Sequence, residues 1–251
     1  MRPLLKVAVP SLLILLIAVV AVVAFLSTRP GDAPPRGPLV GFERGDFSEV
    51  ESHEHKMGRL RVTDARAYEG RRSARATYDG PGPGAERVWL PTNWKTGTDV
   101  WYGMALFVPR DIRWCYWNPL RWDNYDLYGG VDDTTRGTGD VGGLAIEHDR
   151  IRVMRNLYGG HEQTLFDGGT IPLGKWFWLE VHQRFSDRDG QALSELYVDG
   201  ERRGRSTQAN SMGRPIKDLR AGVVNVANQC SSPGSIDFDR LSISDRRRGP
   251  V

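Results

Sequence analysis

The chain has 251 residues, of which 34 are Lys or Arg and 31 are Asp or Glu. Residues 1–38 hold four of the bases and one of the acids, so the remainder carries 30 charges of each sign and is electroneutral. This balance excludes a basic nucleic-acid-binding surface as the default, and we expect no nucleic-acid partner. Two cysteines are too few for a disulfide-dense miniprotein.

The amino-terminal part predicts a membrane anchor. Residues 7–26 contain no charged side chain, and this run of 20 residues matches the length of a helix that crosses a bilayer. A long signal peptide is the alternative, and the protein would then be secreted. Residues 1–6 would be a short cytoplasmic tail, and residues 27–38, with four prolines and two glycines, a stiff linker. The anchor predicts a domain held outside the cytoplasm at the cell surface.

Residues 39–245 show the period-two alternation of β-strands, with turn residues about every ten positions. The strand candidates are residues 57–62, 75–78, 99–108, 144–148, 151–155, 176–185, 193–198, 201–206, 221–226 and 236–244. Asp149-Arg150 separates two of them and predicts a hairpin turn. These strands predict an all-β fold, in which two antiparallel sheets form a jelly-roll sandwich. Residues 246–251 are expected to be a solvated basic tail.

Several segments, taken in order, are similar to those of bacterial polysaccharide lyases with a concanavalin-like jelly roll. Residues 41–47 (GFERGDF) resemble the opening strand of that family, and residues 67–75 (AYEGRRSAR) resemble its second block. Residues 100–111, 174–200 and 238–243 resemble later strands. The resemblance implies a jelly roll that recognises a polysaccharide, of the kind on which heparin, alginate and glucuronan lyases act, with uronate units. It implies no required cofactor.

The resemblance implies that the usual catalytic residues of such lyases are replaced in this chain. Arg121 and Asp123 stand where the family has an amide and an imidazole, in residues 119–123 (PLRWD). Residues 218–225 (DLRAGVVN) are similar to the family's late strand Y-F-K-A-G-V-Y-N, but Asp218 and Val224 replace its two tyrosines. The resemblance therefore leaves two functions open: β-elimination by an altered set of residues, or a non-catalytic lectin-like or surface interaction module.

A polysaccharide lyase neutralises the uronate carboxylate, removes the proton at C5 and protonates the leaving oxygen. An arginine suits the first task because its guanidinium is planar and permanently charged. Histidine and tyrosine suit the proton transfers. The candidate catalytic residues are Arg87, Arg121, Asp123, His148 and Tyr158.

Residues 114–128 contain six aromatic residues with Asn and Asp between them. Sugar rings stack on exposed aromatic side chains, and amides and carboxylates bind their hydroxyls. We therefore predict that Trp117, Trp122 and Tyr125 bind the sugar chain. The alternative is that these rings pack in the core around Cys115.

Two further predictions concern stabilising links. Cys115 and Cys230 are the only cysteines, and we predict a long-range disulfide between them, with two separate buried thiols as the alternative. By analogy with concanavalin-like sandwiches, Glu43 and Asp239 are predicted to share a structural calcium ion.

Overall fold

A computed structural model of the chain describes residues 39–54, 58–80, 84–94, 99–114, 116–123, 140–157, 161–211, 216–226 and 233–250. The predicted anchor and linker lie outside these residues, as do Cys115, Tyr125, Tyr158 and Cys230. Within the described residues no helix has the length and apolar character needed to cross a bilayer. The chain divides into residues 1–36 and residues 37–251, and all described elements belong to the second unit.

The described residues form β-strands and no helix, which confirms the predicted all-β class. The strands are β1 (Leu39–Val40), β2 (Ser52–Glu54), β3 (Gly58–Thr63), β4 (Ser73–Tyr78), β5 (Gly84–Trp94), β6 (Asp99–Phe107), β7 (Trp117–Asp123), β8 (Asp140–Glu147), β9 (Arg150–Leu157), β10 (His161–Thr170), β11 (Trp176–Arg184), β12 (Leu193–Val198), β13 (Glu201–Ser206), β14 (Ile216–Val226) and β15 (Gly234–Ser244).

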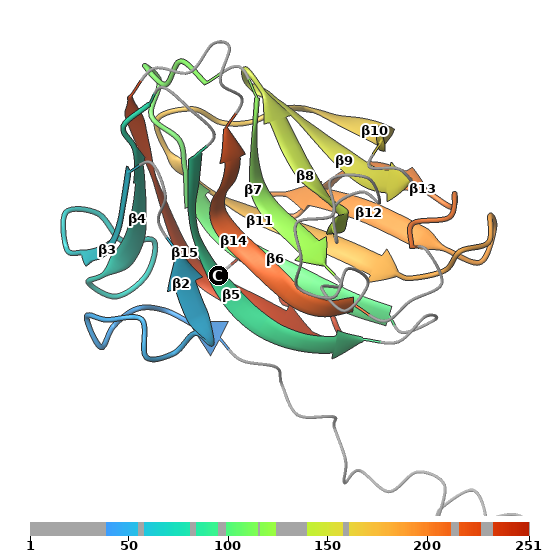
Figure 1. Cartoon of the computed structure of the whole chain (residues 1–251), viewed down its shortest axis with the longest axis horizontal. Helices are drawn as coiled ribbons and strands as arrows, with labels where there is room; N and C mark the ends of the chain where they lie inside the picture. Colours follow the sequence, from blue (N-terminus) through green and yellow to red (C-terminus); the bar gives the residue numbers. More distant parts are fainter. Residues whose placement is uncertain are drawn as a thin grey trace, which may run out of the picture. The chain divides into compact units, whose positions relative to one another are not determined.

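The strands build two antiparallel sheets (Figure 1). The eight-stranded sheet has the order β13-β12-β11-β6-β15-β4-β3, with β1 paired to β15. The seven-stranded sheet has the order β10-β9-β8-β7-β14-β5-β2. Strands distant in sequence pair in the middle of both sheets, β6 with β15 and β7 with β14. The two sheets and these long crossovers are consistent with a jelly-roll sandwich.

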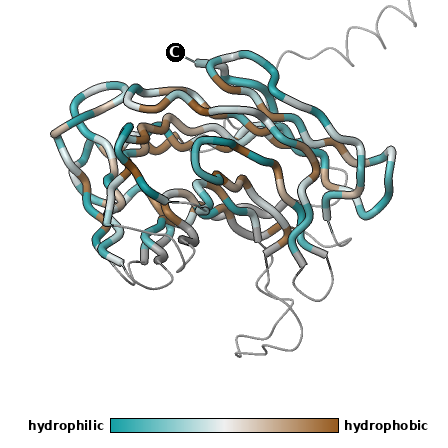
Figure 2. Tube along the Cα trace, turned by 90° about the horizontal axis from the view of Figure 1, so that it is seen from above, coloured by the Kyte–Doolittle hydropathy of each residue, from teal (hydrophilic) through white to brown (hydrophobic). Residues whose placement is uncertain are grey.

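The core lies between the two sheets because alternate residues of each strand point inward. On β6 these are Val100, Tyr102, Met104 and Leu106, all fully buried. On β14 they are Leu219, Ala221 and Val223. Figure 2 shows the resulting change between hydrophobic and hydrophilic residues along both layers.

The predicted hairpin between β8 and β9 is present, but its turn lies one residue earlier than expected. Glu147 pairs with Arg150, so His148 and Asp149 form the turn. His148 has a φ of 56°, in the left-handed region that the first residue of a two-residue hairpin turn adopts. β10 was not among the strand candidates, because its sequence lacks alternation.

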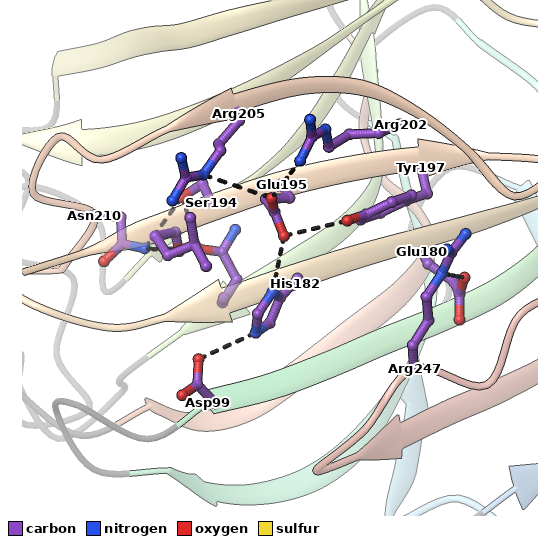
Figure 3. A network of polar contacts seen from close by, with 12 residues as sticks. Asp99, Glu180, His182, Ser194, Glu195, Tyr197, Arg202, Arg205, Asn210 and Arg247 are labelled. Carbon is purple, nitrogen blue, oxygen red and sulfur yellow. Dashed lines mark hydrogen bonds and ion pairs between the residues drawn. The ribbon is translucent and has the colours of Figure 1, made fainter.

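Residues 246–250 are exposed or half-buried, and this predicted basic tail also holds a buried carboxylate of β11. Glu180 is only 1% exposed. Its Oε2 accepts a hydrogen bond from Nε of Arg247 at 3.0 Å (Figure 3). Its Oε1 accepts hydrogen bonds from the backbone N–H groups of Arg248 and Gly249 at 3.1 and 2.8 Å. A buried carboxylate needs such donors, so the tail is ordered by charge rather than by apolar contact.

We predict that Arg247→Ala destabilises the domain by about 1–3 kcal/mol, since the variant loses the ion pair with Glu180. It also loses the contact of the guanidinium with the Tyr197 ring, 4.1 Å from its centroid. The measurement is thermal unfolding followed by circular dichroism. Arg246→Ala is the matched control, because the neighbouring Arg246 side chain is exposed. Equal losses of stability in both variants would contradict the role of Arg247.

Candidate functional site

Three buried arginines lie on the outer face of the seven-stranded sheet, the face turned away from the core. They come from adjacent strands: Arg87 from β5, Arg220 from β14 and Arg121 from β7. Their exposed fractions are 9%, 5% and 5%. Their sequence neighbours on these strands, such as Val88 and Leu219, are core residues, so the pleat directs the arginines to the opposite face. We call these three side chains the arginine face.

Pairing between strands places two of these cations side by side. Arg220 pairs directly with Arg121 across β14 and β7, and with Trp89 across β14 and β5. The guanidinium carbons of Arg87 and Arg220 lie 4.7 and 5.8 Å from the centroid of the Trp89 ring. This ring stabilises both cations through its π face. Like charges on directly paired residues repel each other, so an anion that binds both Arg121 and Arg220 would relieve this repulsion.

A phenol and an acid complete the site beside Arg121. The Glu162 carboxylate, from β10, accepts a short hydrogen bond from the Tyr116 hydroxyl and lies 3.3 Å from a terminal nitrogen of Arg121. The other terminal nitrogen of Arg121 donates to Oδ1 of Asn118 at 3.3 Å, and Asn118 donates to the carbonyl of Leu144 at 2.9 Å. The orientation of the Arg121 guanidinium is therefore fixed by an amide and a carboxylate.

Burial raises the pKa of the Tyr116 phenol far above its ordinary value, and its hydrogen bond to Glu162 raises it further. Tyr116 is therefore a neutral proton donor at physiological pH. A phenol with a raised pKa is a weak acid, so Tyr116 can give up its proton only to a strongly basic oxygen such as an alkoxide.

The two tryptophans predicted to stack on sugar are in the core instead. Trp117 and Trp122 have exposed fractions of 0% and 1%. Trp117 packs edge-on against Trp114, and Trp122 lies parallel to Tyr102 with 5.9 Å between ring centroids. A bulge in β7 between Trp117 and Leu120 lets both tryptophans face inward. Their faces are therefore not available to a ligand.

The other predicted catalytic residues do not all meet at one place. Arg87 and Arg121 share the arginine face. His148 is exposed in the β8–β9 turn, five residues beyond the Gly143 that pairs with Arg121, which is about 16 Å along a strand. Asp123 ends β7, but its side chain and Tyr158 lie outside the description.

Sequence reasoning missed Arg220, Tyr116 and Glu162. Arg220 had a visible signal, because it stands at the lysine position of the family's late strand and alternates with the apolar Leu219 and Ala221. No sequence signal indicated Glu162, because it contacts Arg121 from β10, a strand that the sequence did not predict.

A second polar cluster lies on the eight-stranded sheet (Figure 3). The two ring nitrogens of His182 contact Glu195 at 3.0 Å and Asp99 at 3.1 Å. The imidazole also stacks on Trp101, with ring centroids 4.2 Å apart. Glu195 is further contacted by Tyr197, Arg202 and Arg205. Because these groups bind each other, this cluster serves to connect β6, β11, β12 and β13.

The two residues predicted to hold calcium lie at one cavity of about 310 Å³. Burial raises the pKa of Asp239 to about 7, and the negative charge of Glu43 adds to this rise, against the effect of backbone N–H donors. Within the described residues no cluster of three or more His, Cys, Asp or Glu is placed to hold a metal. Calcium takes six to eight oxygen ligands, so two carboxylates would need water molecules to complete the shell.

No family model and no curated protein matches this sequence. Among solved structures, the chain is similar to the endo-β-1,4-glucuronan lyase of the fungus Trichoderma reesei, with a TM-score of 0.67 and 14% identity over 83% of this chain and 95% of that one. An alginate lyase from Chlorella virus has a TM-score of 0.55 and 12% identity, over 78% and 99% of the two chains.

A structure of botulinum neurotoxin type C has a TM-score of 0.56 and 9% identity, over 85% of this chain and 48% of that one. The cell entry of that toxin depends on interaction with two ganglioside molecules. At such low identities the likeness concerns the fold alone. The chain therefore has a polysaccharide-lyase-like jelly-roll fold, as the sequence resemblance predicted.

Proposed function

We propose that the arginine face binds an acidic polysaccharide. The observation that carries this proposal is the direct pairing of Arg121 with Arg220, two buried cations on adjacent strands. A carboxylate between them would reduce their repulsion and accept hydrogen bonds from both guanidinium groups. A neutral sugar offers no such compensation. The glucuronan and alginate lyases with this fold support uronate units as the charged groups.

A second candidate function is β-elimination at the same face, and Tyr116 favours it. In this reaction a base removes the C5 proton, a double bond forms between C4 and C5, and the bond from C4 to the leaving oxygen breaks. That oxygen takes up a proton. Arg121 would neutralise the carboxylate, which makes the C5 proton more acidic, and the neutral Tyr116 phenol would protonate the leaving oxygen. We propose one of the remaining sequence candidates, Asp123 or Tyr158, as the base.

Without turnover, the same geometry supports a lectin-like module that binds the polysaccharide chain and leaves it intact.

The charge-free run of residues 7–26 supports our further proposal that the domain is anchored at the outer side of a membrane.

We predict that Arg121→Gln and Arg220→Gln each weaken binding of polyglucuronate by about ten- to a hundredfold, the effect of losing a charged hydrogen bond. The measurement is calorimetric titration of the full-length protein, with a neutral cellulose oligosaccharide in parallel. Arg205→Gln is the control, because it removes the same charge from the other sheet, where Arg205 is half exposed. Equal weakening by all three variants would contradict a specific site.

If the protein is a lyase, Tyr116→Phe should lower kcat by about 100- to 10,000-fold, which is the contribution expected of a general acid. Affinity for the acidic chain should change little, because Arg121 keeps its contact with Asn118. The ultraviolet absorbance of the unsaturated chain ends measures the rate. Tyr197→Phe, on the eight-stranded sheet, is the control. An unchanged rate would remove Tyr116 from the mechanism, and no turnover by the wild type would favour the lectin-like module.

We also propose that calcium binds Glu43 and Asp239, and we predict that saturating calcium raises the Tm by about 5–10 °C. The cation would offset the repulsion between the two carboxylates. Glu43→Gln should abolish this shift, whereas Glu51→Gln, which changes an exposed residue of the same region, should retain it. A Tm that does not respond to calcium would contradict the site.

A further inference from the structure

Glu162 reaches the arginine face from the edge of the seven-stranded sheet. It lies on β10, where it pairs with Asn156 of β9, and β8 separates β9 from β7. Its carboxylate nevertheless contacts Arg121 of β7 at 3.3 Å and accepts the hydrogen bond of Tyr116. One side chain therefore connects the edge strand to the centre of the proposed binding face.

The Glu162 carboxylate contacts both groups that an acidic sugar would use in the proposed function, Arg121 and Tyr116. One of its oxygens faces the guanidinium of Arg121, and the other accepts the Tyr116 hydroxyl. These are the two groups to which the proposed function assigns neutralisation of the carboxylate and protonation of the leaving oxygen. A uronate and Glu162 cannot occupy this position together.

The acid is the partner that can leave. The Arg121 side chain is 6% exposed and is also held by Asn118, whereas the Glu162 side chain is 31% exposed. Rotation of Glu162 toward solvent would rehydrate its carboxylate at low cost. Movement of Arg121 would break a buried hydrogen bond, which costs more.

We propose that Glu162 determines specificity by occupying Arg121 as an internal carboxylate, which only a substrate carboxylate displaces. This inference rests on the proposed function of the arginine face. An acidic chain replaces one carboxylate by another, so the charge of Arg121 remains compensated throughout. A neutral chain would have to separate the Arg121–Glu162 ion pair without supplying a carboxylate in place of Glu162, which selects against it.

Because Glu162 competes with the substrate for Arg121, it also lowers the affinity for acidic chains. The exposure of the Arg121–Glu162 ion pair sets an upper limit to this loss. A partly exposed ion pair contributes up to about 1 kcal/mol. With a pair near that upper value, Glu162 occupies Arg121 in most molecules. The apparent affinity for an acidic chain is then reduced in proportion to the open fraction, by about three- to sixfold. Glu162→Gln should recover this factor for acidic chains.

The test is calorimetric titration of full-length wild type and the Glu162→Gln variant with a polyglucuronate oligosaccharide and with a neutral cellulose oligosaccharide. We expect Glu162→Gln to bind the acidic chain about three- to sixfold more tightly, and the ratio of acidic to neutral affinities to change. Asp167→Asn is the matched control: it removes a carboxylate from the same strand, where Asp167 contacts Arg150 instead. It should bind as the wild type does.

Unchanged or weaker acidic binding by Glu162→Gln, with a wild type that binds, would overturn the inference and leave the arginine face intact as a site. Absence of acidic binding in both proteins would overturn the proposed function and this inference with it. Glu162→Ala provides the second variant. If Glu162→Ala also fails to bind the acidic chain more tightly, and its circular dichroism spectrum matches that of the wild type, the negative result is not due to the packing of the glutamine side chain. The inference is then overturned.

Discussion

The candidate site depends on one electrostatic constraint: the paired strands β7 and β14 hold Arg121 opposite Arg220 on a face where both are nearly buried. Isolated guanidinium groups would separate in water. Here they cannot, because Leu120 and Ala221, next to them in sequence, are anchored in the core. The free energy that packs the sandwich thus maintains a concentration of positive charge, which favours an anionic ligand.

The outer faces of the two sheets use charge in different ways. On the eight-stranded sheet, Glu180 is compensated by the carboxy-terminal segment, and His182 is bound by two carboxylates. Opposite charges there stabilise contacts between strands. On the arginine face three arginines lie on adjacent strands, and the Glu162 carboxylate contacts one of them, Arg121. The first arrangement is suited to holding the fold together, and the second to binding an acidic molecule.

The contacts of Tyr116 connect binding to chemistry. Its hydroxyl donates to the same carboxylate that compensates Arg121, so departure of Glu162 would release both groups together. A substrate that takes this place would present its carboxylate to a charged guanidinium and its leaving oxygen to a neutral phenol. The contacts of Glu162 therefore offer a physical reason why binding and proton donation would be coupled.

Local sequence determined the strands with regular alternation, such as β6, β11 and β12, and with them the all-β sandwich, because the pleat separates apolar from polar residues in a way that the sequence records. It also indicated Arg87 and Arg121. Tertiary structure decided which residues accompany them. The bulge in β7 turned Trp117 and Trp122 inward, and the curvature of the sheet brought Glu162 of β10 to Arg121. Such contacts join residues far apart in the chain, and no local pattern encodes them.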